Sequence, residues 1–437
     1  MIQWLLWLGL FLSPFYNVLL FRLGGVELSA ADLPLLLALG LWSAWVVGRG
    51  RCTLTWPTVL LVLFLVTSLA STALSAEVLL GLRRWGRTAI RLLVFAVMLP
   101  DVMVRTTRWR VYVILFIVTG AMFGVLNYID LFVSPRTFMS GFFADSGRWT
   151  AHLRFIYPDP DYVGVNFGHE IGHWEAGALL MLLSMGLASV SARRWLGWLL
   201  LATPIVTTLL FSLTKSAWLG LAVGLSYLMG RLYLSRAVAL RRGLVRVRLY
   251  PVWVTICVSA AVLFTGLLFW FVVLNSATRN LIILAFTFQD VSSSARLALW
   301  RDLVPIIRDH MLLGVGWGNL VDAGLSGDPH SWWLGILAET GWVGFLLYLA
   351  ASVTMFFMID RNCRRMTEEG RFLAIGANAA TLSAGVAGLF EMSFMWSMNA
   401  WWLIGLAVFF THRVCRAEQP PTVGSCESTE CGVLGNA

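Results

Sequence analysis

The sequence predicts an all-α, polytopic integral membrane protein with about twelve transmembrane helices and a large periplasmic loop that carries short surface helices. Hydrophobic residues make up 59% of the 437 residues, charged residues only 13%, and the mean hydropathy is +0.78. Apolar runs of about 20 residues, the length that crosses a bilayer, recur along the chain. These observations exclude a soluble enzyme, a secreted disulfide scaffold, a disordered protein and a coiled coil, because such proteins need far more polar surface.

The apolar runs define the predicted domain organisation. We expect a single membrane domain over residues 1–416, followed by a polar tail at 417–437 that is disordered and cytoplasmic. The first run lacks a basic n-region and a small-residue cleavage site, so we interpret it as a retained span rather than a signal peptide. The predicted spans cover residues 2–21, 31–47, 57–75, 88–104, 111–133, 174–191, 195–212, 216–235, 251–274, 332–358, 372–394 and 397–412.

Arginine placement predicts the orientation, because basic residues concentrate in cytoplasmic loops. The basic runs at 236–248, 360–371 and 412–416 should be cytoplasmic, which with an even span count puts both termini in the cytoplasm. The long loops at about 134–173 and 275–331 then face the periplasm. The arginines that give the net charge of +9 are therefore explained by the orientation of the protein in the membrane. We expect no nucleic acid among the partners.

One basic cluster does not follow this rule. Arg83, Arg84 and Arg87 fall on the outer side between the third and fourth predicted spans. Two interpretations stay open. Either the early spans are miscounted, or the three arginines form an anion site at the outer surface.

The second long loop contains a predicted surface helix at residues 294–310. Apolar residues recur there at helical spacing, among them Trp300, Leu303 and Ile307, and Ser294 can cap the start. We expect this helix to lie along the membrane surface.

Residues 314–344, GVGWGNLVDAGLSGDPHSWWLGILAETGWVG, are the most informative string. Its G-x-G-x-G start is weak evidence for phosphate binding. His330 opens the following span beside Trp332, and a histidine at the wet end of a helix can accept a proton near neutral pH. The alternative is that His330 and the neighbouring tryptophans form an interfacial aromatic belt.

Three segments together resemble the O-antigen ligase and polymerase superfamily. The first contains Ser292, Arg296 and Trp300 and leads into G-V-G-x-G-N at 314–319, and the second runs from His330 to A-E-x-G-x-x-G at 338–344. The third is the start of an earlier span at 213–220. The resemblance implies a superfamily core over about 174–394.

The resemblance also implies roles for particular residues. His330 takes the place of the catalytic base, and Arg296 takes the place of a pyrophosphate-binding arginine. Lys215, the only lysine, stands where the family usually has arginine, so it is either a phosphate contact or a snorkelling anchor. Further candidate substrate-binding residues are Arg154, Arg83, Arg84, Arg87, Trp332 and Glu339.

The function implied by the resemblance is transfer of a glycan from a polyprenyl pyrophosphate to a hydroxyl acceptor in surface polysaccharide biosynthesis. Transfer would occur at the periplasmic face of a bacterial inner membrane. The acceptor would be a lipid core for a ligase or a growing glycan for a repeat-unit polymerase, and both stay open. The lipid-linked donor is already activated, so no cofactor is expected.

Two alternatives come from other classes of protein. His169, Glu170 and His173 form H-E-I-G-H, the pattern of an intramembrane zinc metalloprotease, but no distal third ligand follows, and we predict no metal site. Asp101, Asp130 and Glu391 lie in or near apolar runs, as in a transporter of lipid-linked glycans.

Overall fold

The computed structural model describes residues 1–13, 19–23, 26–132, 169–188, 192–211, 214–241, 291–327, 329–391 and 398–412. Within these ranges the chain is helical except for one short hairpin and the connecting loops. The helices are α1 (Ile2–Phe11), α2 (Asp32–Arg49), α3 (Trp56–Ala73), α4 (Val78–Leu92), the π-helical turn η2 (Leu93–Met98), α5 (Leu99–Val104), α6 (Arg110–Phe132), α8 (His169–Ala188), α9 (Ala192–Phe211), α10 (Lys215–Arg241), α13 (Val291–Asp309), α14 (Trp332–Cys363), α15 (Glu368–Ala387) and α17 (Met398–Thr411).

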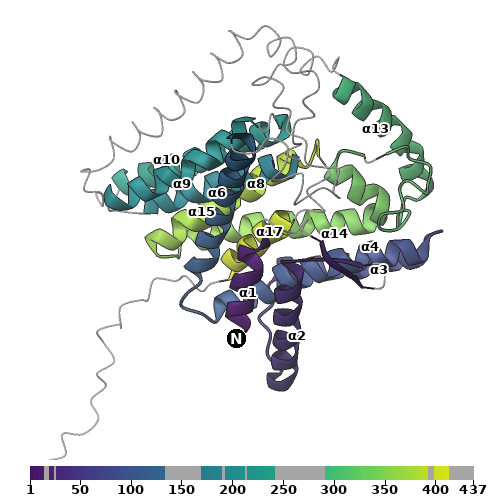
Figure 1. Ribbon diagram of the computed structural model, residues 1–437, viewed down its shortest axis with the longest axis horizontal. Coiled ribbons are helices and arrows are strands. Elements are labelled where there is room, and N and C mark those ends of the chain that lie inside the picture. The colour runs from purple at the N-terminus through teal and green to yellow at the C-terminus, as the bar shows by residue number, and fades with distance from the viewer. Residues whose placement is uncertain are drawn as a thin grey trace, which may run out of the picture.

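The helices form two neighbouring groups (Figure 1). In one group α15 packs against α8 and α10, with α9 and α6 beside them. In the other, α14 packs along α3, and α3 against α4. Helix α17 contacts members of both groups, and α13 lies apart at the margin of the molecule.

Hydropathy confirms a membrane protein. Among the described residues, four helices are long and apolar enough to cross a bilayer, and their candidate spans are Asp32–Arg49, Trp56–Ala73, Lys215–Leu234 and Trp332–Cys363. Shorter apolar helices occur at Ile2–Phe11, Arg110–Leu126, Gly197–Leu209 and Ala400–Thr411. The count of about twelve spans stays a prediction, since the expected span at 251–274 and the tail at 417–437 lie outside the described residues.

The first transmembrane span, predicted at residues 2–21, is shorter than expected. Helix α1 ends at Phe11, and Leu19–Leu23 (β1) pairs antiparallel with Val26–Ser29 (β2), so the chain is not purely helical. The sequence places a proline directly after Ser13, and a proline disfavours helical backbone in the residue before it. The Ser29 N–H and hydroxyl both donate to Asp32, which joins the hairpin to the start of α2.

The helix predicted at 294–310 is present as α13, although it begins at Val291, so Ser294 lies inside it rather than at its cap. Leu303 is completely buried, whereas Leu297 and Val304 are exposed. Apolar side chains thus point both into the protein and outward, and the expected position of α13 along the membrane surface stays a prediction.

Helix α14 is not the straight span that the sequence predicts. Gly341 has φ 65° and ψ −171°, which is not helical. The rings of Trp332 and Tyr348 lie 5.7 Å apart, whereas sixteen residues of straight helix would separate them by about 24 Å. The chain therefore folds back at Gly341, and only the part after Gly341, about 33 Å long, is suited to crossing the bilayer.

The bend is held by bonds from two other segments. Ser71 of α3 donates to the Glu339 carbonyl at 2.7 Å, and the Val315 and Gly316 N–H groups donate to the Ala338 and Glu339 carbonyls at 3.0 Å each. These donors satisfy carbonyl groups that the interrupted helix leaves without a helical partner. The A-E-x-G motif at 338–341 therefore has a structural role, which is to form this bend.

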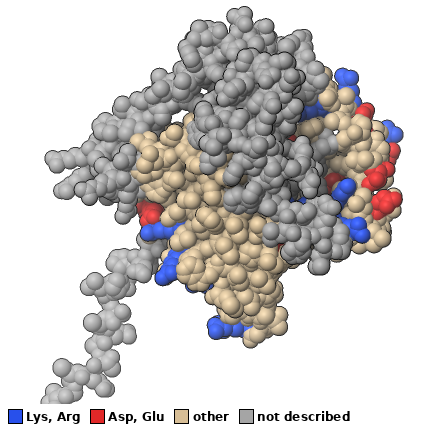
Figure 2. All heavy atoms as spheres, in the orientation of Figure 1, with Lys and Arg blue, Asp and Glu red and all other residues tan. Residues whose placement is uncertain are grey.

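The arginine clusters lie at opposite ends of the bundle. Arg110 pairs with Glu369 at the start of α15, and Arg231 pairs with Asp360 near the end of α14. Arg83 and Arg84 lie on α4, whose Gly81 packs against Thr72 at the other end of α3. In Figure 2 the visible charged atoms gather at the margins of the described surface, with an uncharged region between them.

Gly341→Ala is expected to destabilise the protein. A Cβ at this position would lie 2.3 Å from the backbone of Leu312, and alanine at positive φ costs on the order of 1–3 kcal/mol before any clash. Gly230→Ala on α10 is the matched control, because a Cβ there meets nothing within 4 Å. Thermal unfolding in detergent should show a lower midpoint for Gly341→Ala only, and an unchanged midpoint would contradict the bend.

The orientation is tested by labelling single cysteines in a background that lacks the six native ones. Arg83→Cys and Arg364→Cys replace exposed arginines at opposite ends of the bundle. An impermeant thiol reagent should label position 83 in intact cells and position 364 only after the membrane is permeabilised. Labelling of both positions from one side would show that the predicted topology is wrong.

Candidate functional site

Three helices bring their ends together near the start of α14. Gly220 of α10 packs against Ser383 of α15, and Gly376 of α15 packs against Ser184 of α8. Gly224 lies against both Ala379 of α15 and Leu180 of α8, so with these pairs it shows that α8 and α10 both run antiparallel to α15. The starts of α8 and α10 therefore lie toward the end of α15, which leads directly to Glu391.

The start of α14 is bonded to the segment that follows α15. The Trp332 N–H donates to the Gly388 carbonyl at 2.7 Å and to the Glu391 carbonyl at 3.2 Å. Ser331 caps α14, its hydroxyl accepting from the Leu334 N–H at 3.4 Å. Trp300 of α13 donates to the Pro329 carbonyl at 2.7 Å, so α13 fixes the same turn from its other side.

His330 lies in this turn with a backbone φ of 47°. Among the described residues it is the one non-glycine residue with positive φ. Backbone of this kind is uncommon outside glycine, although histidine adopts it more often than most residues, and it is found preferentially at functional sites. The side chain is 38% exposed, so a substrate can reach the ring.

Glu391 lies between the two predicted catalytic residues. One carboxylate oxygen, Oε1, is 3.9 Å from His330 Nδ1, and the other, Oε2, is 3.9 Å from Arg296 Nη2. The carboxylate is only 4% exposed, while the Arg296 side chain is 20% exposed. The structure therefore brings His330 and Arg296 together around a buried acid, and we call these three residues the charge cluster.

Sequence reasoning did not assign Glu391 to this site. It grouped Glu391 with Asp101 and Asp130 as possible transport residues. Asp101 instead belongs to a structural network, in which Trp42, Thr53 and Arg105 all donate to its carboxylate. The side chain of Asp130 lies outside the described residues. From the sequence, Glu391 could be noticed only as an acid near the end of a predicted span. The fold is needed to show that it faces His330 and Arg296.

The glycine string is a packing element. The N–H groups of Gly314, Val315, Gly316 and Trp317 donate to His310, Ala338, Glu339 and Thr72, respectively, at 2.9–3.0 Å. Backbone N–H groups that are already bonded do not form the anion-binding concavity of a phosphate loop. Positive φ at positions 314, 316 and 318 lets the loop pass close to α14, α3 and α4.

The predicted arginines of α4 differ in their surroundings. Arg84 donates to the Gly318 carbonyl, which ties α4 to the glycine loop. Arg83 is exposed and Arg87 is half-buried on the same helix. Lys215 is exposed at the first position of α10, at the end of the bundle that carries the charge cluster. Arg154 lies outside the described residues.

Trp332 and Glu339 are both enclosed by protein. Trp332 is 2% exposed and packs on Tyr348 and Trp401. Glu339 is 1% exposed, and its carbonyl holds the bend described above. Direct contact of either side chain with a glycan, as predicted from sequence, would require this packing to open.

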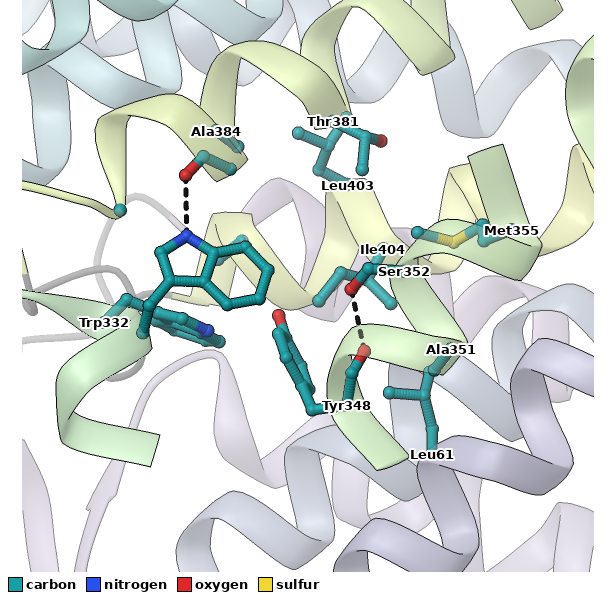
Figure 3. Close-up of a pocket in the computed structure, with 14 residues that line it drawn as sticks. Leu61, Trp332, Tyr348, Ala351, Ser352, Met355, Thr381, Ala384, Leu403 and Ile404 are labelled. Carbon is teal, nitrogen blue, oxygen red and sulfur yellow. Dashed lines mark hydrogen bonds between the residues drawn. The ribbon is translucent and has the colours of Figure 1, made fainter. Parts of the chain in front are cut away.

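A largely apolar cavity of about 60 Å³ lies beside the start of α14, with Trp332, Trp333 and Gly388 among its lining residues. Figure 3 shows Trp332 at one end of the cavity and Met355 at the other, with the Tyr348 ring beside Trp332. Residues of α3, α14, α15 and α17 line it, among them Leu61, Ala351, Thr381, Ala384 and Leu403.

The H-E-I-G-H string lies at the start of α8. His173 is buried, and its Nε2 is 3.4 Å from the Ser216 hydroxyl. The side chains of His169 and Glu170 lie outside the described residues, and within the described part no three metal-ligating side chains come together. The absence of a metal site therefore stays a prediction.

These observations define a membrane protein with a histidine, an arginine and a buried acid in one cluster. Comparison with protein-family models matches residues 199–349 to the family described as O-antigen ligase. The match, which covers residues 199–349 only, supports the predicted resemblance to the O-antigen ligase and polymerase superfamily, whose members are glycosyl-transfer-type ligases and polymerases of polysaccharide biosynthesis. A search of curated proteins finds no significant match.

Arg296→Ala is expected to weaken binding of a polyprenyl pyrophosphate donor by roughly 10- to 100-fold, the usual loss for a charge-assisted hydrogen bond. Arg296→Lys should recover only part, because an ammonium cannot bridge two phosphate oxygens. Arg301→Ala, an exposed arginine on the same helix, is the control and should bind normally. Equal binding by Arg296→Ala and Arg301→Ala would remove Arg296 from the donor site.

Proposed function

We propose that this protein transfers a glycan from a polyprenyl pyrophosphate to a hydroxyl acceptor at the periplasmic face of a bacterial inner membrane. The observation that carries the proposal is the charge cluster, because two of its members, Arg296 and His330, lie inside the segment that matches the O-antigen ligase family. Ligase and repeat-unit polymerase activities share this donor chemistry and differ in the acceptor.

The proposed reaction needs a base and a cation. His330 takes the proton of the acceptor hydroxyl while the oxygen bonds to the sugar carbon that carries the pyrophosphate. The bond between that carbon and the pyrophosphate oxygen breaks, and the polyprenyl pyrophosphate leaves with the bonding electrons. Arg296 stabilises the charge on the leaving group, and Lys215 and Arg83 are further candidate contacts at the same end of the bundle.

The exposures of the residues fit these roles. His330 and Arg296 are both partly exposed and can be reached, whereas the acid between them is enclosed. The predicted surface helix α13 carries Arg296, which would place the guanidinium at the level of a lipid headgroup.

His330→Ala should lower transfer by about 100- to 10,000-fold, the usual cost of losing a general base. Donor binding should stay within about twofold, since the change removes no donor charge. His310→Ala is the control, an exposed histidine at the end of α13. The assay uses purified protein, a polyprenyl pyrophosphate that carries a short glycan, and either lipid core or free glycan as acceptor.

The same assay separates the alternatives. Transfer to lipid core indicates a ligase, and elongation of the glycan indicates a polymerase. Near-normal transfer by His330→Ala would contradict the proposed role of His330 as the general base. Zinc-dependent cleavage of a peptide would favour the metalloprotease, and donor movement across vesicles without a new glycosidic bond would favour transport.

A further inference from the structure

We infer that Glu391 is a positioning residue that orients His330 for proton transfer and links this orientation to donor binding through Arg296. The inference rests on the proposed function and deepens it. It assigns to Glu391 a role in the reaction without contact between its carboxylate and either substrate.

Burial separates Glu391 from its two partners. Its carboxylate is 4% exposed, against 38% for His330 and 20% for Arg296. A substrate can therefore reach the imidazole and the guanidinium but not the acid. An enclosed carboxylate that faces a reachable imidazole and a reachable guanidinium acts through them.

The backbone fixes the distance between Glu391 and His330. The Glu391 carbonyl accepts from the Trp332 N–H at 3.2 Å, two residues beyond His330. The turn between them is held by the Ser331 cap and by the bond from Trp300 to Pro329. The carboxylate of Glu391 and the imidazole of His330 thus belong to one bonded unit, although 61 positions separate them in sequence.

This arrangement favours one form of the ring. Glu391 Oε1 lies on the Nδ1 side of His330. A carboxylate on that side favours a proton on Nδ1 and leaves the lone pair of Nε2 for the acceptor hydroxyl. It also stabilises the imidazolium that forms when the proton arrives. The separation of 3.9 Å is longer than a hydrogen bond, and such contacts often tighten only when substrate binds.

Arg296 makes the arrangement sensitive to the donor. Without donor, the second oxygen of Glu391 faces Arg296. A pyrophosphate carries more negative charge than one carboxylate and can accept a bidentate arginine, so it competes for the guanidinium. The carboxylate is then left to His330. Donor binding thereby strengthens the contact that prepares the base.

The inference predicts opposite effects on binding and on turnover. Glu391→Gln removes a negative charge near the pyrophosphate site, so donor affinity should be unchanged or a few-fold higher, because like charges repel. Turnover should fall by about 10- to 10,000-fold, the range for removing an orienting carboxylate. A purely structural role would weaken both together.

The experiment combines Glu391→Gln with His330→Ala and measures turnover and donor binding separately, with the same polyprenyl pyrophosphate donor. Glu391→Gln should reduce turnover strongly when His330 is present and by less than about twofold when it is absent, because the two residues act as a unit. Glu369→Gln, at the opposite end of α15, is the matched control and should leave both quantities unchanged.

Glu391→Asp covers the case in which the glutamine variant does not fold. It keeps the charge on a shorter side chain, so partial turnover with normal donor binding is expected. Equal losses from Glu391→Gln in both backgrounds would overturn the inference, as would weaker donor binding by a folded Glu391→Gln or Glu391→Asp variant. Near-normal turnover by His330→Ala alone would instead overturn the proposed function, and the inference would fall with it.

Discussion

The bend of α14 at Gly341 is the constraint on which the rest of the structure depends. In a bilayer, backbone groups must be satisfied by the protein itself. The interrupted helix leaves carbonyl groups at Ala338 and Glu339, and the glycine loop and Ser71 supply the donors. Because α14 folds back, its first residues lie beside Tyr348 rather than far beyond it. His330 therefore lies next to the end of α15 and close to Glu391.

The glycine motif at 314–319 stabilises this bend, so its role is structural. Loop 314–319 bonds to α14 and α3, and Arg84 of α4 bonds to the loop. Residues that sequence motifs suggest as a phosphate site thus join three helices instead. In the proposed reaction, positive charge for the donor would come from side chains such as Arg296 of α13.

The charge cluster shows how a membrane protein can keep an acid enclosed. A buried carboxylate is costly unless a cation or another polar group faces it. Here the Arg296 guanidinium and the His330 imidazole both face it, at equal distances, and both stay partly exposed. This arrangement differs from the network around Asp101, whose carboxylate accepts hydrogen bonds from Trp42, Thr53 and Arg105. Glu391 instead faces two partly exposed side chains at 3.9 Å, beyond hydrogen-bond distance.

The sequence by itself determined the class of protein, most helix positions and the resemblance to the O-antigen ligase superfamily, because hydropathy and local motifs depend on residues close together in the chain. It also singled out His330 and Arg296, whose roles stay a proposal. It could not determine that α1 stops at Phe11, that α14 folds back at Gly341, or that Trp332 is enclosed. These features depend on contacts between distant segments. Glu391 is the clearest case. As one acid at the end of an apolar run it indicates nothing specific, and its place between His330 and Arg296 exists only once α13, α14 and α15 have packed.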